Sequence, residues 1–524
     1  MKFQFGWDMG VVSQVPRRPR HTRARRWMVA LAVTITVLAG AHAAMGNLGS
    51  TIIFNLQPFL DRTGFIATYN VHGNIDTTNP FFQNLGTNER NCATCHQASD
   101  AMSISAAHAQ ARFANTHGAD PLFASVDGAN CPTVTDRSDA DAHSLVRQHG
   151  LIRIGLALPT TMQFTINVVH DPYGCAMVPD PVSGQMIVSV YRRPLPTTNL
   201  NFLSAIMFDG RETASPLNSA ATFQANLTAN LTHQAMDATN IHAQANPPFA
   251  VTDSRLPQMV SLELGLSTAQ IYDFAAGYLG ARGALGGPFY LSQTQYHPGI
   301  NDVLGADPNG VAFNSSAFTI FAPWQNLAPR RDPEDSFDRT AARKAIAAGE
   351  VIFNARPIDI RNVRGLNDNP ALGSSIPGFC TSCHDTPNVG NHSVALPLDI
   401  GTSHSLRQET DPAIAAGLAQ LSSPDVPVYL ISGCPDPFNT TQPSPNPPAS
   451  FYTTDPGKAL ITGKCSDFNR GKGPILRGLA ARAPYFHNGA ARDLNQIVNF
   501  YNQRFQMNLT DQEKTNLVAF LNSL

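Results

Sequence analysis

The sequence is short of charge and of tryptophan. Asp, Glu, Lys and Arg make up only 14% of its 524 residues, and there are three tryptophans. This composition argues against a charged helical bundle. Together with 38 glycines and 39 prolines, it predicts long ordered loops. A chain of this length is too long for one ordinary hydrophobic core, so we expect two or more domains.

An excess of positive charge is also absent. The whole chain holds 36 basic and 38 acidic residues, a net charge of −2. Without its first 43 residues, which hold seven basic residues and one acidic residue, the net charge becomes −8. This balance argues against nucleic acid as a partner. It allows a basic protein partner, such as a small electron carrier.

Long hydrophobic runs are missing everywhere except near the N-terminus. There, the basic stretch Arg17–Trp27 precedes the apolar stretch Met28–Gly40 and the small-residue site Ala41-His42-Ala43. This order is typical of a secretory signal peptide, which we predict over residues 1–43. The alternative is an uncleaved anchor helix, but the apolar run is short for a full span. We therefore expect a periplasmic protein with no membrane span after signal cleavage.

Cysteine is scarce, yet half of the eight cysteines stand in one repeated motif. Cys92 and Cys95 precede His96, and Cys380 and Cys383 precede His384. In such a CxxCH motif, two thiols reach the two vinyl groups of a porphyrin and the adjacent imidazole binds its iron. A zinc site would need further paired ligands at finger spacing, and a redox pair gives no reason for histidine at both sites. The motifs predict two covalently bound haem c groups, with His96 and His384 as proximal ligands.

The other four cysteines form two local pairs, each downstream of one CxxCH motif. Export would place them in an oxidising space, where disulfides form. We predict the disulfides Cys131–Cys175 and Cys434–Cys465, although the sequence alone leaves other connectivities open.

The two motifs suggest two regions of unequal length. Residues 44–328 hold the first motif and residues 335–524 the second, with a charged, proline-containing linker at Pro329–Ser336. Several segments rich in Pro, Asn and Gly read as loops around the haems: 119–141, 170–199, 285–316 and 432–458. The rest reads as mostly helical, so the predicted fold class is mainly α.

Helix signals are strongest in the second region. Apolar residues recur at helical spacing from Ala341 to Phe353. Asp493 is the expected N-cap of a helix whose apolar face includes Tyr501, and Thr510 with Glu513 forms a capping box for a last helix.

Three segments resemble a known family. RGLAARAPYFHNGAARDLNQIVNFY (Arg477–Tyr501), continued by LTDQEKTNLVAFL, is similar to the C-terminal signature of bacterial di-haem cytochrome c peroxidases. IMFDGRET (Ile206–Thr213) looks like their FWDGR segment, and the family also includes the enzyme MauG. The resemblance implies two cytochrome c-like helical domains with one haem each. The first haem would meet hydrogen peroxide, and the second would accept electrons from a small donor protein, a cytochrome c or a cupredoxin.

The resemblance also assigns residues to the second haem and to the space between the haems. Tyr501 aligns with the position that supplies the second axial ligand of the C-terminal haem, and Met507 and His392 are the alternative ligands. A core tyrosine with a paired hydroxyl would show the same sequence pattern. Phe208 stands where the family has a tryptophan between the haems. Arg211 could pair with a haem propionate or with a nearby acid.

Around the first haem the resemblance is less complete. Gln234 takes the position of a glutamine in the family's peroxide pocket, but Gln244 stands where the family has a glutamate. An amide can orient peroxide but cannot accept its proton, so His242 or His233 could substitute for the missing acid.

Two further departures concern the open site and calcium. Segment 184–198 has no histidine to block the first haem, so its iron would be open unless Met186 or Tyr191 binds. Arg193 and Arg482 occupy positions where the family binds calcium. A guanidinium cannot bind that ion, so calcium is doubtful here.

These observations favour three functions in order. The first is a peroxidase that passes electrons from the C-terminal to the N-terminal haem. The second is MauG-like or oxygenase-like oxidation of a protein or an organic substrate. The third is a non-enzymatic di-haem electron carrier, which would need both irons to be six-coordinate.

Overall fold

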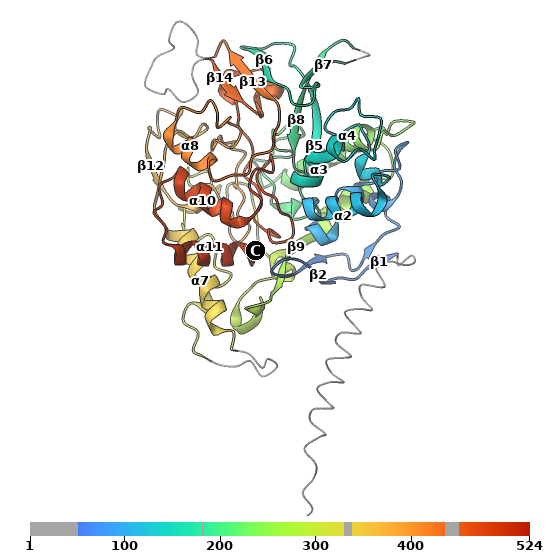
Figure 1. Ribbon diagram of the computed structural model, residues 1–524. Helices are drawn as coiled ribbons and strands as arrows, with labels where there is room; N and C mark the ends of the chain where they lie inside the picture. Colours follow the sequence, from blue (N-terminus) through green and yellow to red (C-terminus); the bar gives the residue numbers. More distant parts are fainter. Residues whose placement is uncertain (1–50, 181–182, 330–337, 435–449) are drawn as a thin grey trace, which may run out of the picture. The chain divides into compact units, whose positions relative to one another are not determined.

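The computed structural model describes residues 51–180, 183–329, 338–434 and 450–524 (Figure 1). Residues Ile52–Leu524 form one compact unit. The expected signal peptide and its cleavage site lie outside the described residues, as does the linker beyond Pro329. The division into a domain over 44–328 and another over 335–524 stays a prediction.

The prediction of a mainly α fold is wrong. The described residues are 29% helical and 15% strand, and they form five antiparallel sheets. In order of pairing, the sheets are β1 (Ile52–Ile53) with β4 (Ile75–Asp76); β10 (Gly277–Tyr278), β9 (Leu266–Asp273), β3 (Gly64–Asn70) and β2 (Phe59–Leu60); β11 (Ile358–Ile360) with β12 (Ile376–Gly378); β14 (Phe451–Thr453), β13 (Val428–Ser432) and β6 (Thr165–His170); and β5 (Ile152–Ala157), β8 (Met186–Arg192) and β7 (Met177–Pro179).

The local sequence pattern did not predict the strands, and the reason is physical. A half-buried strand alternates apolar and polar residues, but β9 buries five residues in a row. Its partner β3 lies 200 residues away, and the hydroxyls of Thr68 and Thr268 meet at 2.9 Å in the buried ladder. The segment 170–199 was expected to be a loop, yet it contains β7 and β8.

One sheet joins distant parts of the chain. In Figure 1, orange β13 and β14 lie beside teal β6, and Ile431 is the register partner of Ile166. The sheet therefore links segments on both sides of the expected linker.

The helices of the described residues are α2 (Ala106–Thr116), α3 (Ser144–His149), α4 (Phe223–His242), α5 (Leu256–Gly265), α6 (Pro288–Ser292), α7 (Thr340–Ala355), α8 (Pro412–Leu418), α9 (Ala459–Thr462), α10 (Leu494–Arg504) and α11 (Asp511–Asn522). The three helices predicted in the second region are confirmed as α7, α10 and α11. Asp493 accepts a hydrogen bond from the Gln496 backbone, and Thr510 and Glu513 form the expected capping box.

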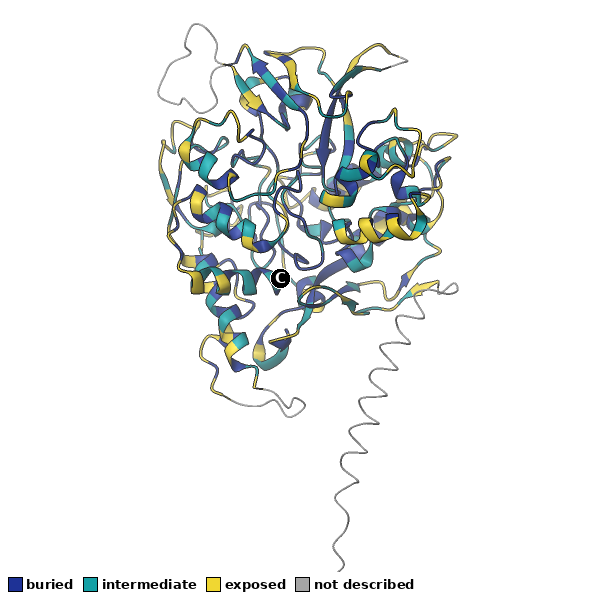
Figure 2. Cartoon of the chain, viewed as in Figure 1, coloured by how far each residue is buried: buried dark blue, intermediate teal, exposed yellow. Residues whose placement is uncertain are grey.

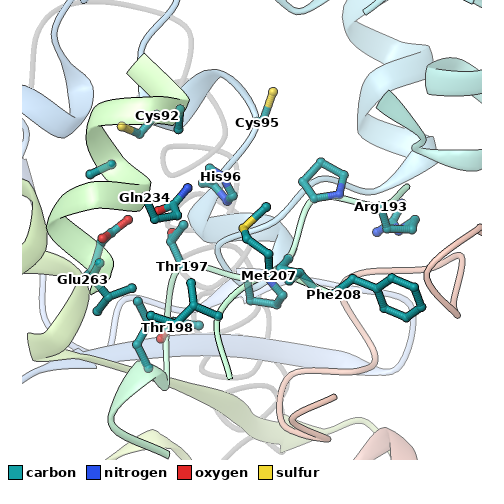
Figure 3. Close-up of a pocket in the computed structure, with 18 of the residues that line it drawn as sticks. Cys92, Cys95, His96, Arg193, Thr197, Thr198, Met207, Phe208, Gln234 and Glu263 are labelled. Atoms are coloured by element: carbon teal, nitrogen blue, oxygen red, sulfur yellow. The ribbon is translucent and has the colours of Figure 1, made fainter. Parts of the chain in front are cut away.

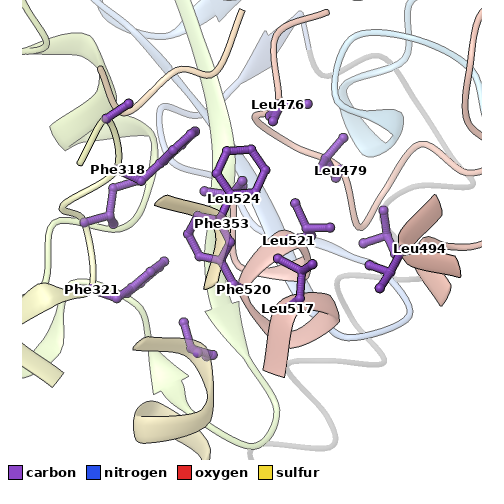
Figure 4. Close-up of a cluster of buried hydrophobic side chains, with 14 of the residues drawn as sticks. Phe318, Phe321, Phe353, Leu476, Leu479, Leu494, Leu517, Phe520, Leu521 and Leu524 are labelled. Atoms are coloured by element: carbon purple, nitrogen blue, oxygen red, sulfur yellow. The ribbon is translucent and has the colours of Figure 1, made fainter. Parts of the chain in front are cut away.

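The largest hydrophobic cluster packs α7 against α11. Phe353 of α7 and Phe520 of α11 lie 5.6 Å apart between ring centroids, and Phe318 meets both rings edge-on (Figure 4). At Gly349, a side chain would collide with the Asn516 carbonyl. Glycine therefore allows the two helices to approach closely.

Helix α2 is amphipathic. Figure 2 shows exposed residues on one face of α2, whereas its Ala109 and Phe113 are buried. Among the described residues, we find no helix that combines the length and the hydropathy that a membrane crossing needs.

Both predicted disulfides are confirmed. Cys131 bonds to Cys175, and Cys434 bonds to Cys465. The four cysteines of the CxxCH motifs are free.

Candidate functional site

Each CxxCH motif lines its own cavity. The first cavity has a volume of about 200 Å³ and the second about 250 Å³. Both motifs begin with one turn of 3₁₀-helix, at Cys92–Thr94 and at Cys380–Ser382, and in each motif the two cysteines and the histidine line the same cavity. The residues predicted to hold haem are thus gathered in two similar settings.

Each motif histidine is held in one orientation. His96 Nδ1 donates to the Met102 carbonyl at 3.0 Å, and His384 Nδ1 donates to the Gly390 carbonyl at 2.5 Å. Burial lowers the pKa of both imidazoles to about 4. A neutral imidazole that donates through Nδ1 leaves Nε2 free as a metal ligand, which is the arrangement iron needs.

The motif cysteines do not fit a redox role. Burial raises the pKa of Cys380 and Cys383 to about 12 and also raises that of Cys92, whereas thiol exchange needs a thiolate. The two metal-type clusters found among the described residues contain no cysteine. Free thiol pairs beside a neutral imidazole in a cavity fit a haem attached through thioethers.

Buried cations around the cavities point to an anionic guest. Among the described residues, Nε and Nη2 of Arg477 and Nε of Arg482 have no hydrogen-bond partner. Burial lowers the pKa of Arg477 to about 9 and that of Arg482 to about 10. Buried charges are normally paired, so these cavity-lining guanidinium groups lack anions, which porphyrin propionates would supply.

The arginine expected at a calcium position is surrounded by carbonyl groups. Arg193 Nη2 donates to the carbonyls of Ile104 at 2.5 Å and Arg482 at 2.7 Å, and its Nη1 donates to that of His149 at 3.4 Å. Backbone carbonyls are ligands that calcium prefers, and here a guanidinium occupies them. That arginine takes the place of calcium stays a prediction.

The two cavities share a wall. The residues that line both are Arg193, Pro194, Leu195, Pro196, Phe208, Lys472, Pro474, Arg482 and His487. Phe208 stacks on His487, with ring centroids 4.3 Å apart, and the Arg192 guanidinium lies 5.0 Å from its ring. Phe208 therefore stands between the two candidate haem sites, as the resemblance implied.

Helices α4 and α5 bring polar groups into the first cavity. Gln234 of α4 and Glu263 of α5 both face the space beside His96 (Figure 3). Glu263 is 5% exposed, and its Oε2 accepts no hydrogen bond from any described residue. Burial raises the pKa of this carboxyl to about 8. A buried carboxyl in this state can hold or release a proton near neutral pH.

Sequence reasoning missed Glu263. We looked for an acid near position 244, whereas the packing of α5 against α4 supplies one from position 263. A signal was present: Glu263 is the only charged residue of α5, among apolar residues such as Met259 and Val260. A lone acid in an apolar helix marks a special environment.

His242 also lines the first cavity, where an acid holds it. Its Nδ1 contacts Asp127, which also pairs with Arg90. Burial alone would raise the pKa of Asp127, but the charges of Arg90 and His242 outweigh it and hold that pKa below its usual value. The carboxylate therefore fixes the imidazole in one orientation, as in other acid–base sites.

Three of the expected residues are either outside the first cavity or already paired with an acid. Gln244 is exposed and bonds to Asn88, and His233 pairs with Glu212 outside the cavity. Arg211 lines the cavity but already pairs with Asp209 at 3.0 Å.

The proposed blocking side chains lie elsewhere too. Met186 is exposed, and the Tyr191 hydroxyl donates to the Asn130 carbonyl. Met207, which sequence reasoning missed, lines the first cavity with a left-handed backbone, φ +63°. Such a conformation is unfavourable for a non-glycine residue, so packing around the cavity holds it.

In the second cavity, Tyr501 has an unusual hydroxyl. It comes from α10, burial raises its pKa, and it has no hydrogen-bond partner among the described residues. By contrast, the core hydroxyl of Tyr429 donates to the carbonyls of Ala176 and Ser189. Tyr501 is half-buried and lines the cavity, so its hydroxyl is free to meet a bound group there.

The two rivals of Tyr501 also line this cavity. Met507 is 4% exposed, and His392 is 2% exposed. The imidazole of His392 donates to Asp385 at 2.7 Å, and Asp385 directly follows the proximal histidine His384 in the sequence. His392 is therefore engaged on the loop that also holds His384.

Comparisons with known proteins find a sequence match for part of this chain. No protein-family model matches the chain. A segment of 159 residues is 31% identical to cytochrome-c peroxidase IdrP2 of Denitromonas iodatirespirans, covering 28% of this chain and 36% of that protein. The chain thus matches about a third of that relative's length.

A solved structure was also found, a MauG-like protein associated with microbial copper homeostasis. The alignment covers 85% of this chain and 87% of that one at 12% identity, with a TM-score of 0.31. That score is too low to support an argument about the fold. Part of the chain is therefore similar to a cytochrome-c peroxidase, and the cavities fit the cofactor of such a protein.

Proposed function

We propose that the protein is a periplasmic oxidoreductase with two covalently bound haem c groups that reduces hydrogen peroxide. The observation that carries the proposal is the pair of CxxCH-lined cavities with one shared wall. Partial similarity to a cytochrome-c peroxidase supports it. Export to the periplasm rests on the predicted signal peptide.

Specific residues would hold the two groups. Cys92 and Cys95 would bond one porphyrin and Cys380 and Cys383 the other, while each motif histidine offers Nε2 to iron. Arg477 and Arg482 would pair with carboxylates at the porphyrin edge. When bound, the haem irons would supply peroxide binding and one-electron transfer.

The chain itself would manage the protons. Reduction of hydrogen peroxide to two waters consumes two electrons and two protons. Glu263 can hold or move a proton at its carboxyl oxygens, and Gln234 can orient peroxide through its amide. His242, held by Asp127, is a second proton carrier at the same cavity.

Electrons would enter at the second cavity and cross the shared wall. The chain without its first 43 residues carries a net charge of −8, which favours a basic electron-donor protein, a small cytochrome c or a cupredoxin. Phe208 and His487 fill the gap between the two sites. No nucleic acid partner is expected.

The test is stopped-flow absorption of the holoprotein mixed with peroxide, fully ferric or with the second haem reduced. We expect the reduced haem to re-oxidise while peroxide is consumed. Glu263→Gln should slow this at least about 100-fold, because general acid–base groups contribute that much. Glu212→Gln, which removes a buried acid outside the cavity, is the control. No reaction in either redox state would overturn the proposal in favour of an electron carrier.

A second function has one observation in its favour. The partnerless Tyr501 hydroxyl faces the second cavity, and in the resembled family a tyrosine at this position belongs to the MauG-like branch. That branch oxidises a protein or organic substrate. A ferric protein that forms a long-lived spectral change with peroxide, without consuming donor electrons, would favour this function.

A further inference from the structure

A buried polar cluster lies behind the second CxxCH motif. Asp385 follows His384 directly, and His392 and Asp302 lie beside it. One carboxylate oxygen of each aspartate and one ring nitrogen of the histidine lie within 4.8 Å of one another. Asp385 is 0% exposed, Asp302 1% and His392 2%. The proposed peroxidase chemistry uses neither aspartate of this cluster, although His392 also lines the second cavity.

The hydrogen bonds within the cluster leave one carboxylate oxygen unsatisfied. Asp385 accepts from His392 Nδ1 and from the Ser393 backbone, both at 2.7 Å. Asp302 Oδ2 accepts from the backbones of Leu304 and Ala306. Its other oxygen, Oδ1, has no partner among the described residues. Most buried polar atoms are satisfied, so an unsatisfied carboxylate oxygen of a residue in this cluster indicates a missing ligand.

The charges point to the nature of that ligand. Two buried carboxylates face a single imidazole, and no ion pair joins either carboxylate to a lysine or arginine of the described residues. Isolated buried carboxylates are costly, and proteins pair them with cations or metal ions. The two carboxylates therefore lack a compensating cation, and Asp302 Oδ1 also lacks a hydrogen-bond donor.

We propose that Asp302, Asp385 and His392 bind a divalent ion of the first transition row, with zinc and manganese as the best candidates. Two carboxylates and an imidazole suit such ions, whereas calcium prefers oxygen ligands alone. On binding at Nδ1, the metal takes the place of the hydrogen that His392 Nδ1 donates to Asp385, and a neutral imidazole keeps that proton on Nε2.

The ion would stiffen the proximal side of the second cavity. Asp385 and His392 begin and end the segment that contains Gly390, whose carbonyl orients His384. Asp302 belongs to a separate loop, so the ion would fasten that loop to this segment. The site is distinct from the haem iron, which His384 would bind.

The second metal-type cluster, Glu212, His233 and Asp237, carries no such proposal. His233 is 52% exposed on its side chain and already pairs with Glu212 at 2.8 Å. This cluster serves as a control site in the test below, because a metal ion could also bind at the surface.

The test uses the holoprotein, stripped with a chelator and then equilibrated with zinc or manganese. Plasma mass spectrometry should find one ion per chain in addition to haem iron. Asp302→Asn keeps the acceptor for Leu304 and Ala306 but removes the charge, and it should weaken binding at least about 10-fold. Asp307→Asn changes another buried acid of the same loop and should keep the ion.

Thermal unfolding gives an independent readout. Added zinc or manganese should raise the Tm of the wild type and of Asp307→Asn, but not that of Asp302→Asn. His392→Gln serves as a second variant if Asp302→Asn does not fold. A wild type without an added ion, a response to calcium alone, or an ion lost only in Asp237→Asn would each overturn the proposal.

Discussion

Phe208 lies flat on His487 in the wall between the two cavities, with the ring planes inclined by only 9°. Burial lowers the pKa of His487 to about 4, so the stacked imidazole is neutral at pH 7. The wall at this point is therefore two uncharged rings in van der Waals contact. This pair offers an aromatic bridge for electrons that would pass between the proposed haems.

We predict that removing the Phe208 ring slows that passage. Phe208→Leu should reduce the rate of electron transfer between the haems about 10-fold, whereas Phe208→Trp should preserve it, because an aromatic ring still fills the gap. Gly471→Ala should also slow it, since the added Cβ collides with the ring.

Flash-induced absorption changes of the half-reduced protein measure this rate. Phe164→Leu disrupts a similar pair, Phe164 with Phe468 at 4.4 Å, away from both cavities, and is the control. Equal rates in Phe208→Leu and the wild type would remove Phe208 from the path.

Tyr501→Phe tests the partnerless hydroxyl. If the phenol binds the second iron, its loss should convert the second haem from low-spin to high-spin, as seen by electron paramagnetic resonance. Tyr429→Phe removes a hydroxyl that donates to two carbonyls, so it should cost about 1 kcal/mol of stability and leave the haem spectra unchanged. A low-spin second haem in Tyr501→Phe would transfer the role to Met507.

Glu263 predicts a pH-dependent stability. Burial raises its pKa from 4.5 to about 8 in the folded state, so folding favours the protonated carboxyl. The resulting stability is fully present below the unfolded pKa and is lost as pH rises through about 8. Glu263→Gln, which cannot ionise, should therefore gain stability relative to the wild type between pH 5 and pH 9. Urea unfolding at pH 5, 7 and 9 measures the difference, and parallel curves would contradict the assignment.

The Arg477 guanidinium, whose Nε and Nη2 have no hydrogen-bond partner among the described residues, predicts a shift in reduction potential. A buried positive charge beside a haem favours the reduced iron, so Arg477→Gln should lower the potential of the first haem. Roughly 59 mV corresponds to each tenfold change in a one-electron equilibrium. Spectroelectrochemical titration measures it. Arg255→Gln removes an exposed arginine and should leave both potentials unchanged. An unaltered potential in Arg477→Gln would mean that no propionate pairs with it.

Features set by near neighbours in the chain could be predicted from the sequence. The CxxCH motifs, the cap at Asp493 and the capping box of Thr510 depend on residues a few positions apart. The two disulfides could be paired correctly because the cysteines of each pair are 44 or 31 residues apart and follow the same CxxCH motif. The alignment to a known family placed Phe208 and Gln234 at the cavities.

Features set by distant contacts could not. The fold class failed because Thr68 meets Thr268 in a sheet that no local window contains. The same limit hid Glu263, which enters the cavity only because α5 packs on α4. The unpaired guanidinium of Arg477 was also invisible, because a sequence does not record which charges lack partners.

The sheet of β14, β13 and β6 has a consequence for the order in which the chain is completed. β6 leaves the ribosome more than 250 residues before β13, which is its pairing partner. Until then β6 presents a bare backbone edge, and such edges recruit other chains. Long-range pairing of this kind also slows folding. A chain truncated before residue 428 would therefore leave β6 without this pairing partner and prone to pair with another chain.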